Sequence, residues 1–391
     1  MGDHKPSPMK QNQSLLEELD IKPVVNAAGT VTVLGGCLVH DEVLDAARQM
    51  AKIFIDMNAL HEKVGVFVAE LVGSEAAYIT SGAAAGLVLS VGACMTNGDA
   101  DLMHKLPCGA GIVKNEVIVQ KLHRNMYDHN LEVGGASIRE IGSEEKTSAD
   151  DLRKAISQRT AAVVYFAYDP QNGVLPLTEV IALSHEKRIP VIVDAAAELP
   201  PVENLSKYLK MGADIVLFSG GKDIGAPNDT GVILGKRELV KRCMRLGPQS
   251  YEPYGTGRRV YIGRPMKTSK EDIVAFAVAI KRYIRTDHKA RLREWEKKTD
   301  FMIDRLSKSS KIKVKKTFPG VPHNRPVSIP RVEIEILTQK TAIELLDALV
   351  KLNPPVYAYA LENKLFLNPQ CLKDGEEKIV VDSLLKLLPD Q

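Results

Sequence analysis

The chain has 391 residues, more than one hydrophobic core usually organises, so we expect two to three domains. Hydrophobic residues make up 45% and charged residues 26% of the sequence, a balance typical of a globular protein. The 52 basic and 49 acidic residues leave a net charge of only +3, which excludes binding of nucleic acid through bulk charge.

We expect an N-terminal segment over residues 1–40, and its start, Met1-Gly-Asp-His-Lys-Pro-Ser-Pro8, has no apolar core typical of a signal peptide. Pro6 stands where a myristoylation motif requires Ser or Thr. The longest mildly apolar stretch, residues 83–95, is too short and too polar to cross a bilayer. We therefore expect a soluble protein with no membrane partner.

A large α/β domain is predicted over residues 41–264. Apolar residues recur at helical spacing in some segments and form short continuous runs in others. The expected helices are 41–54, 64–72, 83–95, 148–157, 178–187 and 205–211. The expected strands are 77–80, 116–120, 137–141, 161–167, 191–193, 215–218 and 230–234. Strands that alternate with amphipathic helices predict a mostly parallel sheet covered on both faces.

A smaller α+β domain is predicted over residues 265–391, with the join near Gly255-Thr-Gly257. It begins with a long charged helix, 271–306. Further helices are expected at 341–352 and 376–387, and strands at 311–315, 328–336, 356–360 and 364–367. The basic run Lys311-Ile-Lys-Val-Lys-Lys316 alternates with apolar residues, which favours an exposed strand over a nucleic-acid site.

Lys222 and Asp194 are the leading catalytic candidates. Asp194 follows the apolar run Val191-Ile-Val193, and Lys222 follows the next run and two glycines. Open α/β sheets bind ligands at the carboxyl ends of their strands, so both groups are expected at one edge. A lysine there can form a Schiff base with pyridoxal phosphate (PLP), and an aspartate can keep its pyridine nitrogen protonated. An isolated lysine is usually only a solvated loop residue, and Asp194 alone is compatible with a helix cap.

Small and polar residues at other strand ends extend this prediction to a whole cofactor site. Ser81, Gly82, Ala83 and Ala84 start a helix whose free N–H groups attract a phosphate dianion. Ser219 supplies a hydroxyl for the same phosphate, and Ala196 is small enough to lie against a flat ring. His123 is a candidate to stack on the outer ring face, although most single histidines are structural.

Arg264 and Lys267 form a short basic cluster, Arg264-Pro-Met-Lys267, after the last strand predicted for the large domain. Such clusters are usually solvated, but here they are candidates to bind an anionic group of the substrate. The five cysteines are scattered and lack a C-x-x-C pair, so we expect reduced thiols in a cytoplasmic protein and no metal site.

The sequence resembles the selenocysteine-synthase-like branch of fold-type I PLP enzymes, and within it the D-glucosaminate-6-phosphate ammonia-lyase type. Matching runs span nearly the whole chain: 25–36, 79–86, 115–129, 193–201, 219–224 and 263–267. The resemblance implies an aspartate-aminotransferase-like fold and the roles given above to Lys222, Asp194 and the residues around them. It also implies at least a homodimer, because enzymes of this fold usually share active sites between protomers.

Two departures from the family pattern bear on the reaction. Gly35-Gly36 replaces the arginine of the selenium transferases, and the loose N-terminus is too short for their tRNA-binding domain, which disfavours a tRNA substrate. The lyase run Gly-Pro-Gln-Ser-Thr-Gly is replaced by Ala226-Pro-Asn-Asp-Thr-Gly231.

The sequence therefore predicts a PLP-dependent ammonia-lyase. Its substrate would be an anionic 2-amino-3-hydroxy acid such as D-glucosaminate 6-phosphate. Alternatives are a selenocysteine-synthase-like transferase, a lyase for sulfur or selenium amino acids, racemisation or aldol cleavage by the same cofactor, and an inactive binding protein.

Overall fold

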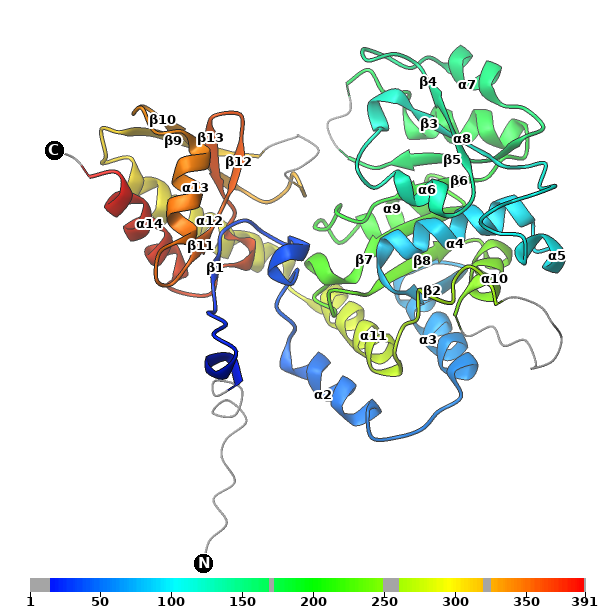
Figure 1. The fold of residues 1–391 in the computed structure, drawn as a ribbon, viewed down its shortest axis with the longest axis horizontal. Coiled ribbons are helices and arrows are strands. Elements are labelled where there is room, and N and C mark those ends of the chain that lie inside the picture. The colour runs from blue at the N-terminus through cyan, green and yellow to red at the C-terminus, as the bar shows by residue number, and fades with distance from the viewer. Residues whose placement is uncertain (1–14, 169–171, 249–259, 319–324, 390–391) are drawn as a thin grey trace, which may run out of the picture. The chain divides into compact units, whose positions relative to one another are not determined.

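The computed structural model describes residues 15–168, 172–248, 260–318 and 325–389. Contacts divide the chain into two compact units (Figure 1). Unit 1 consists of Met1–Leu34, Lys289–Pro319 and Ile329–Gln391, and unit 2 of Gly35–His288 and Gly320–Ser328.

This division differs from the predicted segments 1–40, 41–264 and 265–391. The first strand pairs within unit 1, and residues 265–288 pack within unit 2. Compact units need not be independent domains, so the predicted domain bounds stay a prediction. The join predicted at Gly255-Thr-Gly257 lies outside the described residues.

A seven-stranded sheet forms the centre of unit 2. Its strands, in spatial order, are β2 (Ala76–Thr80), β8 (Gly231–Gly235), β7 (Ile215–Ser219), β6 (Val191–Asp194), β5 (Thr160–Phe166), β3 (Glu116–Gln120) and β4 (Ser137–Ile141). Only β8 runs against its neighbours, and the remaining pairs are parallel. The prediction of a mostly parallel sheet is confirmed, and every strand predicted for this part of the chain is present.

Helices cover both faces of this sheet. One face carries α4 (Gly82–Thr96), α5 (Ala100–Met103), α6 (His129–Val133) and α10 (Arg237–Leu246). The other carries α2 (Asp41–Met50), α3 (Met57–Val72), α7 (Ala149–Ala155), α8 (Leu177–Glu186), α9 (Asn204–Lys210) and α11 (Lys270–Arg285). Alternate residues of each strand enter the two cores, as Val216 and Leu217 do in β7, because side chains on a strand point to opposite faces.

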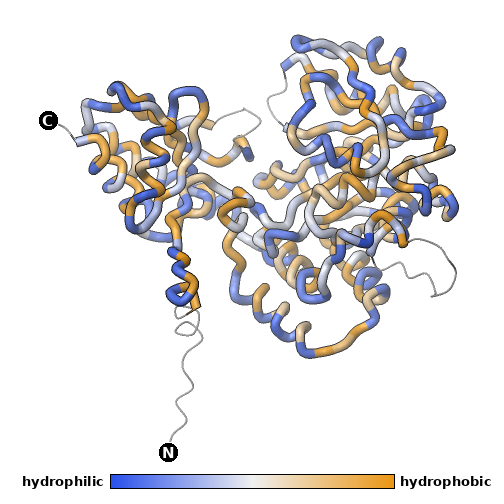
Figure 2. Tube along the Cα trace, in the orientation of Figure 1, coloured by the Kyte–Doolittle hydropathy of each residue, from blue (hydrophilic) through white to orange (hydrophobic). Residues whose placement is uncertain are grey.

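Three helices of unit 2 were not predicted: α5, α6 and α10. The first two span only 4 and 5 residues, too few to display helical periodicity. In α10 the buried residues Leu239, Val240, Cys243 and Leu246 do follow helical spacing, but between them the helix is strongly basic. Figure 2 shows how hydrophilic and hydrophobic residues alternate along such helices, whereas the central strands are hydrophobic.

Unit 1 contains a four-stranded antiparallel sheet and a two-stranded parallel pair. The sheet order is β12 (Tyr359–Leu361), β13 (Lys364–Leu367), β10 (Arg331–Ile336) and β9 (Ile312–Thr317). The pair joins β1 (Val25–Asn26) to β11 (Val356–Tyr357), and the helices are α12 (His288–Leu306), α13 (Ala342–Val350) and α14 (Glu376–Leu387). The predicted α+β composition of the C-terminal part is therefore confirmed.

The single long helix predicted over 271–306 is wrong. It is two helices, α11 and α12, because Thr286 adopts an extended backbone with φ −70° and ψ 141°. Thr286 and Asp287 prefer turns and caps to helix interiors, and this pair was the overlooked signal.

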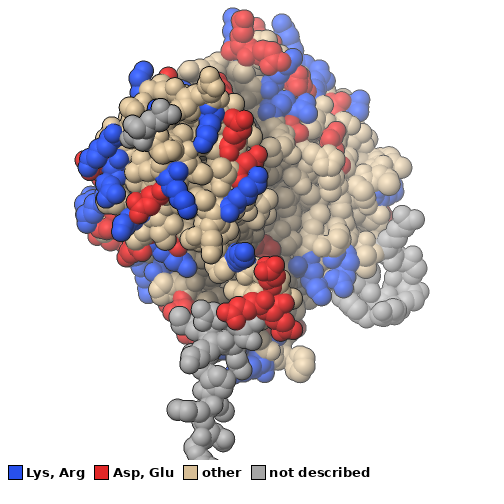
Figure 3. All heavy atoms as spheres, turned by 60° about the vertical axis from the view of Figure 1, so that its left-hand side comes forward, with Lys and Arg blue, Asp and Glu red and all other residues tan. Residues whose placement is uncertain are grey.

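The basic run 311–316 lies in β9, the edge strand of the small sheet. Two of its four lysines have acidic partners: Lys315 lies 3.3 Å from Glu333 of β10, and Lys316 lies 2.6 Å from Asp300 of α12. Figure 3 shows Lys and Arg side chains next to Asp and Glu on the face that it draws. The prediction of an exposed strand here is confirmed.

Candidate active site

Lys222 and Asp194 lie at the same edge of the central sheet. Asp194 is the last residue of β6, and Lys222 is in a tight helical turn, Gly220–Ile224, that directly follows β7. The two strands are adjacent and parallel, with Asp194 opposite Leu217. The structure therefore brings together the two residues predicted to carry the chemistry.

Backbone hydrogen bonds tie the turn that holds Lys222 to the residue just before β8 and close it on itself. The Gly220 N–H donates to the Thr230 carbonyl at 2.8 Å, and the Ala226 N–H donates to the Gly220 carbonyl at 3.0 Å. A Cβ added at Gly221 would lie 2.4 Å from the Cα of Asn228, so only glycine permits this approach. The paired glycines thus serve close backbone packing, and the backbone of Lys222 has little freedom to move.

The buried setting favours the neutral forms of both groups. Burial lowers the pKa of Lys222, and the charges of Asp194 and Glu198 oppose this effect. Burial also raises the pKa of Asp194, while the Ala196 N–H, at 2.9 Å, and the charge of Lys222 favour the carboxylate. A second positive charge facing Asp194, such as a protonated pyridine nitrogen, would further favour its ionised form.

Arg325 and Glu198 are functional candidates that the sequence analysis missed. Their side chains form an ion pair of 2.6 Å, and both are at least nine-tenths buried. Arg325 also donates to the Ala167 carbonyl at 3.2 Å and lies 4.2 Å from the ring centroid of Tyr168. Its charge acts on both Lys222 and Asp194, so the pair belongs to the electrostatics of this site.

The predicted phosphate cradle lies at the same edge. Gly231, the first residue of β8, is paired with Thr80 at the end of β2 on one side and with Ser219 at the end of β7 on the other. A Cβ on Gly231 would lie 2.5 Å from the carbonyl carbon of Gly82, where α4 begins. The free N–H groups at the start of α4 are therefore held close to the strand that adjoins Ser219.

Ser81 precedes α4 but makes no side-chain cap bond to it. Its hydroxyl donates instead to the Met266 carbonyl at 3.0 Å. This bond brings the segment 264–267 to the start of α4. The side chains of Arg264 and Lys267 on that segment are exposed, so they are available to a ligand.

His123 is buried in the turn that follows β3, beyond β5 from Asp194 in the sheet. Its ring meets Tyr165 edge-on at 4.5 Å between centroids and Tyr168 at 5.4 Å. Tyr168 connects this cluster to Arg325 through the cation–π contact. His123 thus belongs to the same group of side chains as Arg325.

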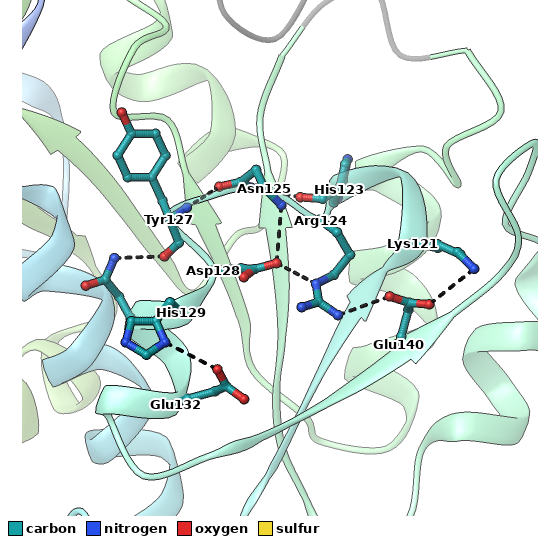
Figure 4. A network of polar contacts seen from close by, with 10 residues as sticks. Lys121, His123, Arg124, Asn125, Tyr127, Asp128, His129, Glu132 and Glu140 are labelled. Carbon is teal, nitrogen blue, oxygen red and sulfur yellow. Dashed lines mark hydrogen bonds and ion pairs between the residues drawn. The ribbon is translucent and has the colours of Figure 1, made fainter.

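A polar network fixes the backbone around His123 (Figure 4). The Asn125 side chain donates to the His123 carbonyl at 2.8 Å, and the Tyr168 hydroxyl donates to the Leu122 carbonyl at 2.6 Å. Arg124 binds Asp128 at 2.5 Å and Glu140 at 3.0 Å, as Figure 4 shows. The loop therefore holds the imidazole in one place.

The Gly35-Gly36 turn lies against the turn of Lys222. A Cβ on Gly36 would lie 2.5 Å from the Gly221 carbonyl oxygen, and the Cys37 N–H donates to that oxygen at 3.0 Å. Burial raises the pKa of the Cys37 thiol to about 11, so it is uncharged at neutral pH. The turn thus places glycine backbone directly against the turn that holds Lys222.

All five cysteines are free thiols. Among the residues that the structure describes, no three His, Cys, Asp or Glu side chains gather as they would around a metal ion. Within the same ranges, no helix is long and apolar enough to cross a membrane.

The comparisons with known proteins agree with this geometry. The family model described as aminotransferase class V matches residues 120–347, more than half of the chain. The chain belongs to the aminotransferase class V family.

Individual relatives give more specific comparisons than the family model does. It is 33% identical over 302 residues to a 5'-C-glycyluridine monooxygenase-decarboxylase of a Streptomyces species, covering 75% of this chain and 71% of the relative. It is also 33% identical over 276 residues to the D-glucosaminate-6-phosphate ammonia lyase of Salmonella typhimurium, covering 69% and 70%. Similarity to the L-seryl-tRNA(Sec) selenium transferase of Rhizobium meliloti is weaker, 25% over 425 residues, covering 93% and 84%.

A solved structure of a D-glucosaminate-6-phosphate ammonia-lyase matches with a TM-score of 0.80 and 26% identity, covering 96% of this chain and 99% of that one. The resemblance stated from the sequence and the fold-type I architecture are therefore confirmed. The protein is a PLP-dependent enzyme of this class V family. The described residues fit the cofactor, with a half-buried lysine and a half-buried aspartate at the carboxyl ends of adjacent strands, beside a free helix N-terminus.

Proposed function

We propose that the protein is a PLP-dependent ammonia-lyase acting on an anionic 2-amino-3-hydroxy acid, with a phosphorylated amino sugar acid such as D-glucosaminate 6-phosphate as the leading substrate. The observation that carries the proposal is the placement of Lys222 and Asp194 at the ends of adjacent strands, close to the start of α4. The 33% identity to an ammonia lyase supports the reaction type.

PLP, when bound, would supply an electron sink for the substrate's α-carbon. Lys222 would hold the cofactor, and the lowered pKa of its amine would suit it to take the α-proton as a base. Asp194 would keep the pyridine nitrogen in its protonated form. His123, Ala196 and Ser219 would border the ring and phosphate, with Ser81 and the N–H groups of Gly82, Ala83 and Ala84.

The overall reaction balances without an oxidant. The substrate loses its 2-amino group as ammonia and its 3-hydroxyl as water, and one water is consumed when the carbonyl forms at C2. The products are a 2-keto-3-deoxy acid and ammonia. Proton removal by Lys222 at C2 starts this sequence.

Arg264 and Lys267 would bind the substrate's anionic group. Their exposure and the bond from Ser81 to the Met266 carbonyl support this assignment, because the segment lies beside the start of α4. Arg264→Gln/Lys267→Gln should raise KM for a phosphorylated substrate much more than it lowers kcat. A matched control is Arg153→Gln/Lys154→Gln on the exposed face of α7.

The direct test is to incubate the holoenzyme with D-glucosaminate 6-phosphate and measure ammonia and 2-keto acid. Equal amounts of both products support the lyase. Consumption of a sulfur or selenium amino acid instead would establish the alternative lyase. Racemisation or aldol cleavage would release neither ammonia nor 2-keto acid, and would be detected as the epimer of the substrate or as an aldehyde together with glycine. An inactive binding protein would retain the cofactor and convert nothing.

A second candidate reaction follows from the monooxygenase-decarboxylase relative, which is equally similar at 33% identity. Such an enzyme would act on an amino acid attached to a nucleoside. Oxygen consumption together with release of carbon dioxide would identify it, whereas the lyase reaction proceeds at the same rate without oxygen.

We also propose a cytoplasmic homodimer or larger homo-oligomer. Apolar side chains on and between α2 and α3 are exposed, notably Leu44, Phe54 and Val66. A patch of this kind is typical of an interface. Light scattering on the eluted holoenzyme should give at least twice the chain mass of 42.9 kDa.

A further inference from the structure

Unit 2 contains a cavity of about 730 Å³ at the edge of the central sheet opposite to Lys222. Its lining includes Ala161 at the start of β5, Pro190 just before β6 and Asp214 just before β7. These are the amino ends of strands whose carboxyl ends form the active site. Strands of four to seven residues separate the two edges by about 13–23 Å. The cavity is therefore distinct from the cofactor site.

Positive charge dominates the walls of this cavity. Four cations, Lys114, Arg188, Lys236 and Arg242, line it together with His185, and Asp214 is the only acidic side chain among the lining residues. The sum of these charges is 4 − 1 = +3 with His185 neutral. Such a surface favours a ligand with two or three negative charges.

The single carboxylate is already satisfied. Asp214 lies 2.5 Å from the Lys236 ammonium and 2.8 Å from His185 Nε2, and it accepts the Val191 N–H at 2.7 Å. It is 3% exposed, so it presents almost no free negative surface. The remaining cations are not neutralised by it.

Helix ends account for only part of this cluster. Arg188 follows the C-terminus of α8, and Arg242 binds Asn97 at the C-terminus of α4 at 2.7 Å, positions where a cation complements the dipole. Lys236 instead precedes the N-terminus of α10, an end that favours acidic residues, and Lys114 lies in a loop before β3. Helix termini thus account for Arg188 and Arg242, and the ion pair with Asp214 accounts for Lys236, so Lys114 is the lining cation to which neither gives a structural role.

The cavity also has apolar walls, to which Leu102, Val113 and Leu239 contribute. Its volume lies within the range of small-molecule sites, roughly 300–1,000 Å³. Arg and Lys groups bind phosphate oxygens through charge-assisted hydrogen bonds. We propose that this cavity is a second ligand site that binds an organic phosphate, with the phosphate on the cations and an uncharged body against the apolar wall.

The test is calorimetric titration of the PLP-saturated enzyme with ADP and, separately, with inorganic pyrophosphate, at one ionic strength. ADP serves as the organic phosphate and pyrophosphate as the anion alone. We expect saturable binding of ADP that is tighter than that of pyrophosphate. Absence of saturable binding, or equal affinity for both, would overturn the proposal.

Variants assign the binding to this cavity. Lys114→Gln/Arg188→Gln removes two exposed cations and should weaken ADP binding at least tenfold. Arg153→Gln/Lys154→Gln changes the net charge equally at two exposed residues of α7 that do not line the cavity, and should leave the affinity unchanged. Arg264→Gln/Lys267→Gln should also leave it unchanged. If this last variant alone abolished binding, the ligand would occupy the active site and the proposal would fail.

Discussion

Arg325 and Glu198 form a buried ion pair of 2.6 Å whose two charges act on Lys222 in opposite directions. Glu198 raises the pKa of the Lys222 amine and Arg325 lowers it. The pair therefore adjusts how readily this lysine acts as a base.

Glu198→Gln should move the acidic limb of the kcat profile to lower pH, by about half a pH unit or more. Without the Glu198 charge, the pKa of Lys222 falls and the amine stays neutral in more acidic solution. The measurement is kcat against pH for both enzymes. Glu203→Gln, an exposed neighbour, should leave the profile in place, and a shift toward higher pH in Glu198→Gln would contradict the assignment.

Lys222→Ala should remove covalent attachment of the cofactor, because the alanine side chain has no amine to form the Schiff base. The wild-type protein is expected to be yellow and, after borohydride reduction, to gain the mass of the reduced cofactor. The variant should show neither property, while Lys210→Ala on the exposed end of α9 should show both. Covalent cofactor on Lys222→Ala would refute the central assignment.

Asp194→Asn should lower kcat by about a hundredfold or more, since an amide cannot hold the pyridine nitrogen protonated. The side chain keeps its size and can still accept the Ala196 N–H bond. Absorbance spectra should show that cofactor is retained while turnover is lost. Asp150→Asn on α7 is the matched control, and near-normal turnover in Asp194→Asn would exclude this role.

Gly231→Ala should weaken cofactor binding more than it weakens the fold. The new Cβ would meet the carbonyl carbon of Gly82 at 2.5 Å and displace the start of α4. Overpacking of this kind costs about 1–3 kcal/mol. Ile233→Val in the same strand is the control: it should lower the free energy of unfolding by about 0.5–1.5 kcal/mol without changing the predicted phosphate cradle. Cofactor dissociation constants and urea unfolding, measured on both, should separate the two effects.

His61 should make folding stability depend on pH. Its ring is 1% exposed, and neither ring nitrogen has a hydrogen-bond partner among the described residues. Burial lowers the pKa of His61 from 6.5 to about 4. Between pH 6.5 and 4, His61 is protonated in the unfolded chain but neutral in the folded protein. The free energy of unfolding therefore has its full value above pH 6.5 and falls as the pH drops toward 4.

The expected loss over that window is about 3 kcal/mol. His61→Phe should remove this part of the slope in unfolding experiments at a series of pH values, because a phenyl ring cannot be protonated. His185→Phe is not a suitable control, since its ring binds Asp214. His129→Phe, at an exposed histidine, is a suitable control. An unchanged dependence of stability on pH in His61→Phe would contradict the prediction.

Local sequence signals predicted the central sheet and the residues at its carboxyl edge. Asp194 directly follows one short apolar run and Lys222 follows the next after Ser219 and two glycines, so their positions follow from local sequence. The role of Arg325 could not be predicted in this way, because its contact with Glu198 spans 127 residues. The strand predicted at 356–360 includes β11, but β1 and its pairing with β11 were missed, since a two-residue strand carries no periodicity.

The reversed direction of β8 has a mechanical consequence. β8, the strand that follows Lys222, starts at the same edge of the sheet where β7 ends, so no crossover helix is needed between them. The residues between the two strands form a short connection, and Gly220 and Thr230 at its ends are joined by a backbone hydrogen bond. In the proposed reaction Lys222 binds the cofactor, is released from it and then takes a proton. Because its backbone is fixed, these changes of position would come from rotation of its four-carbon side chain.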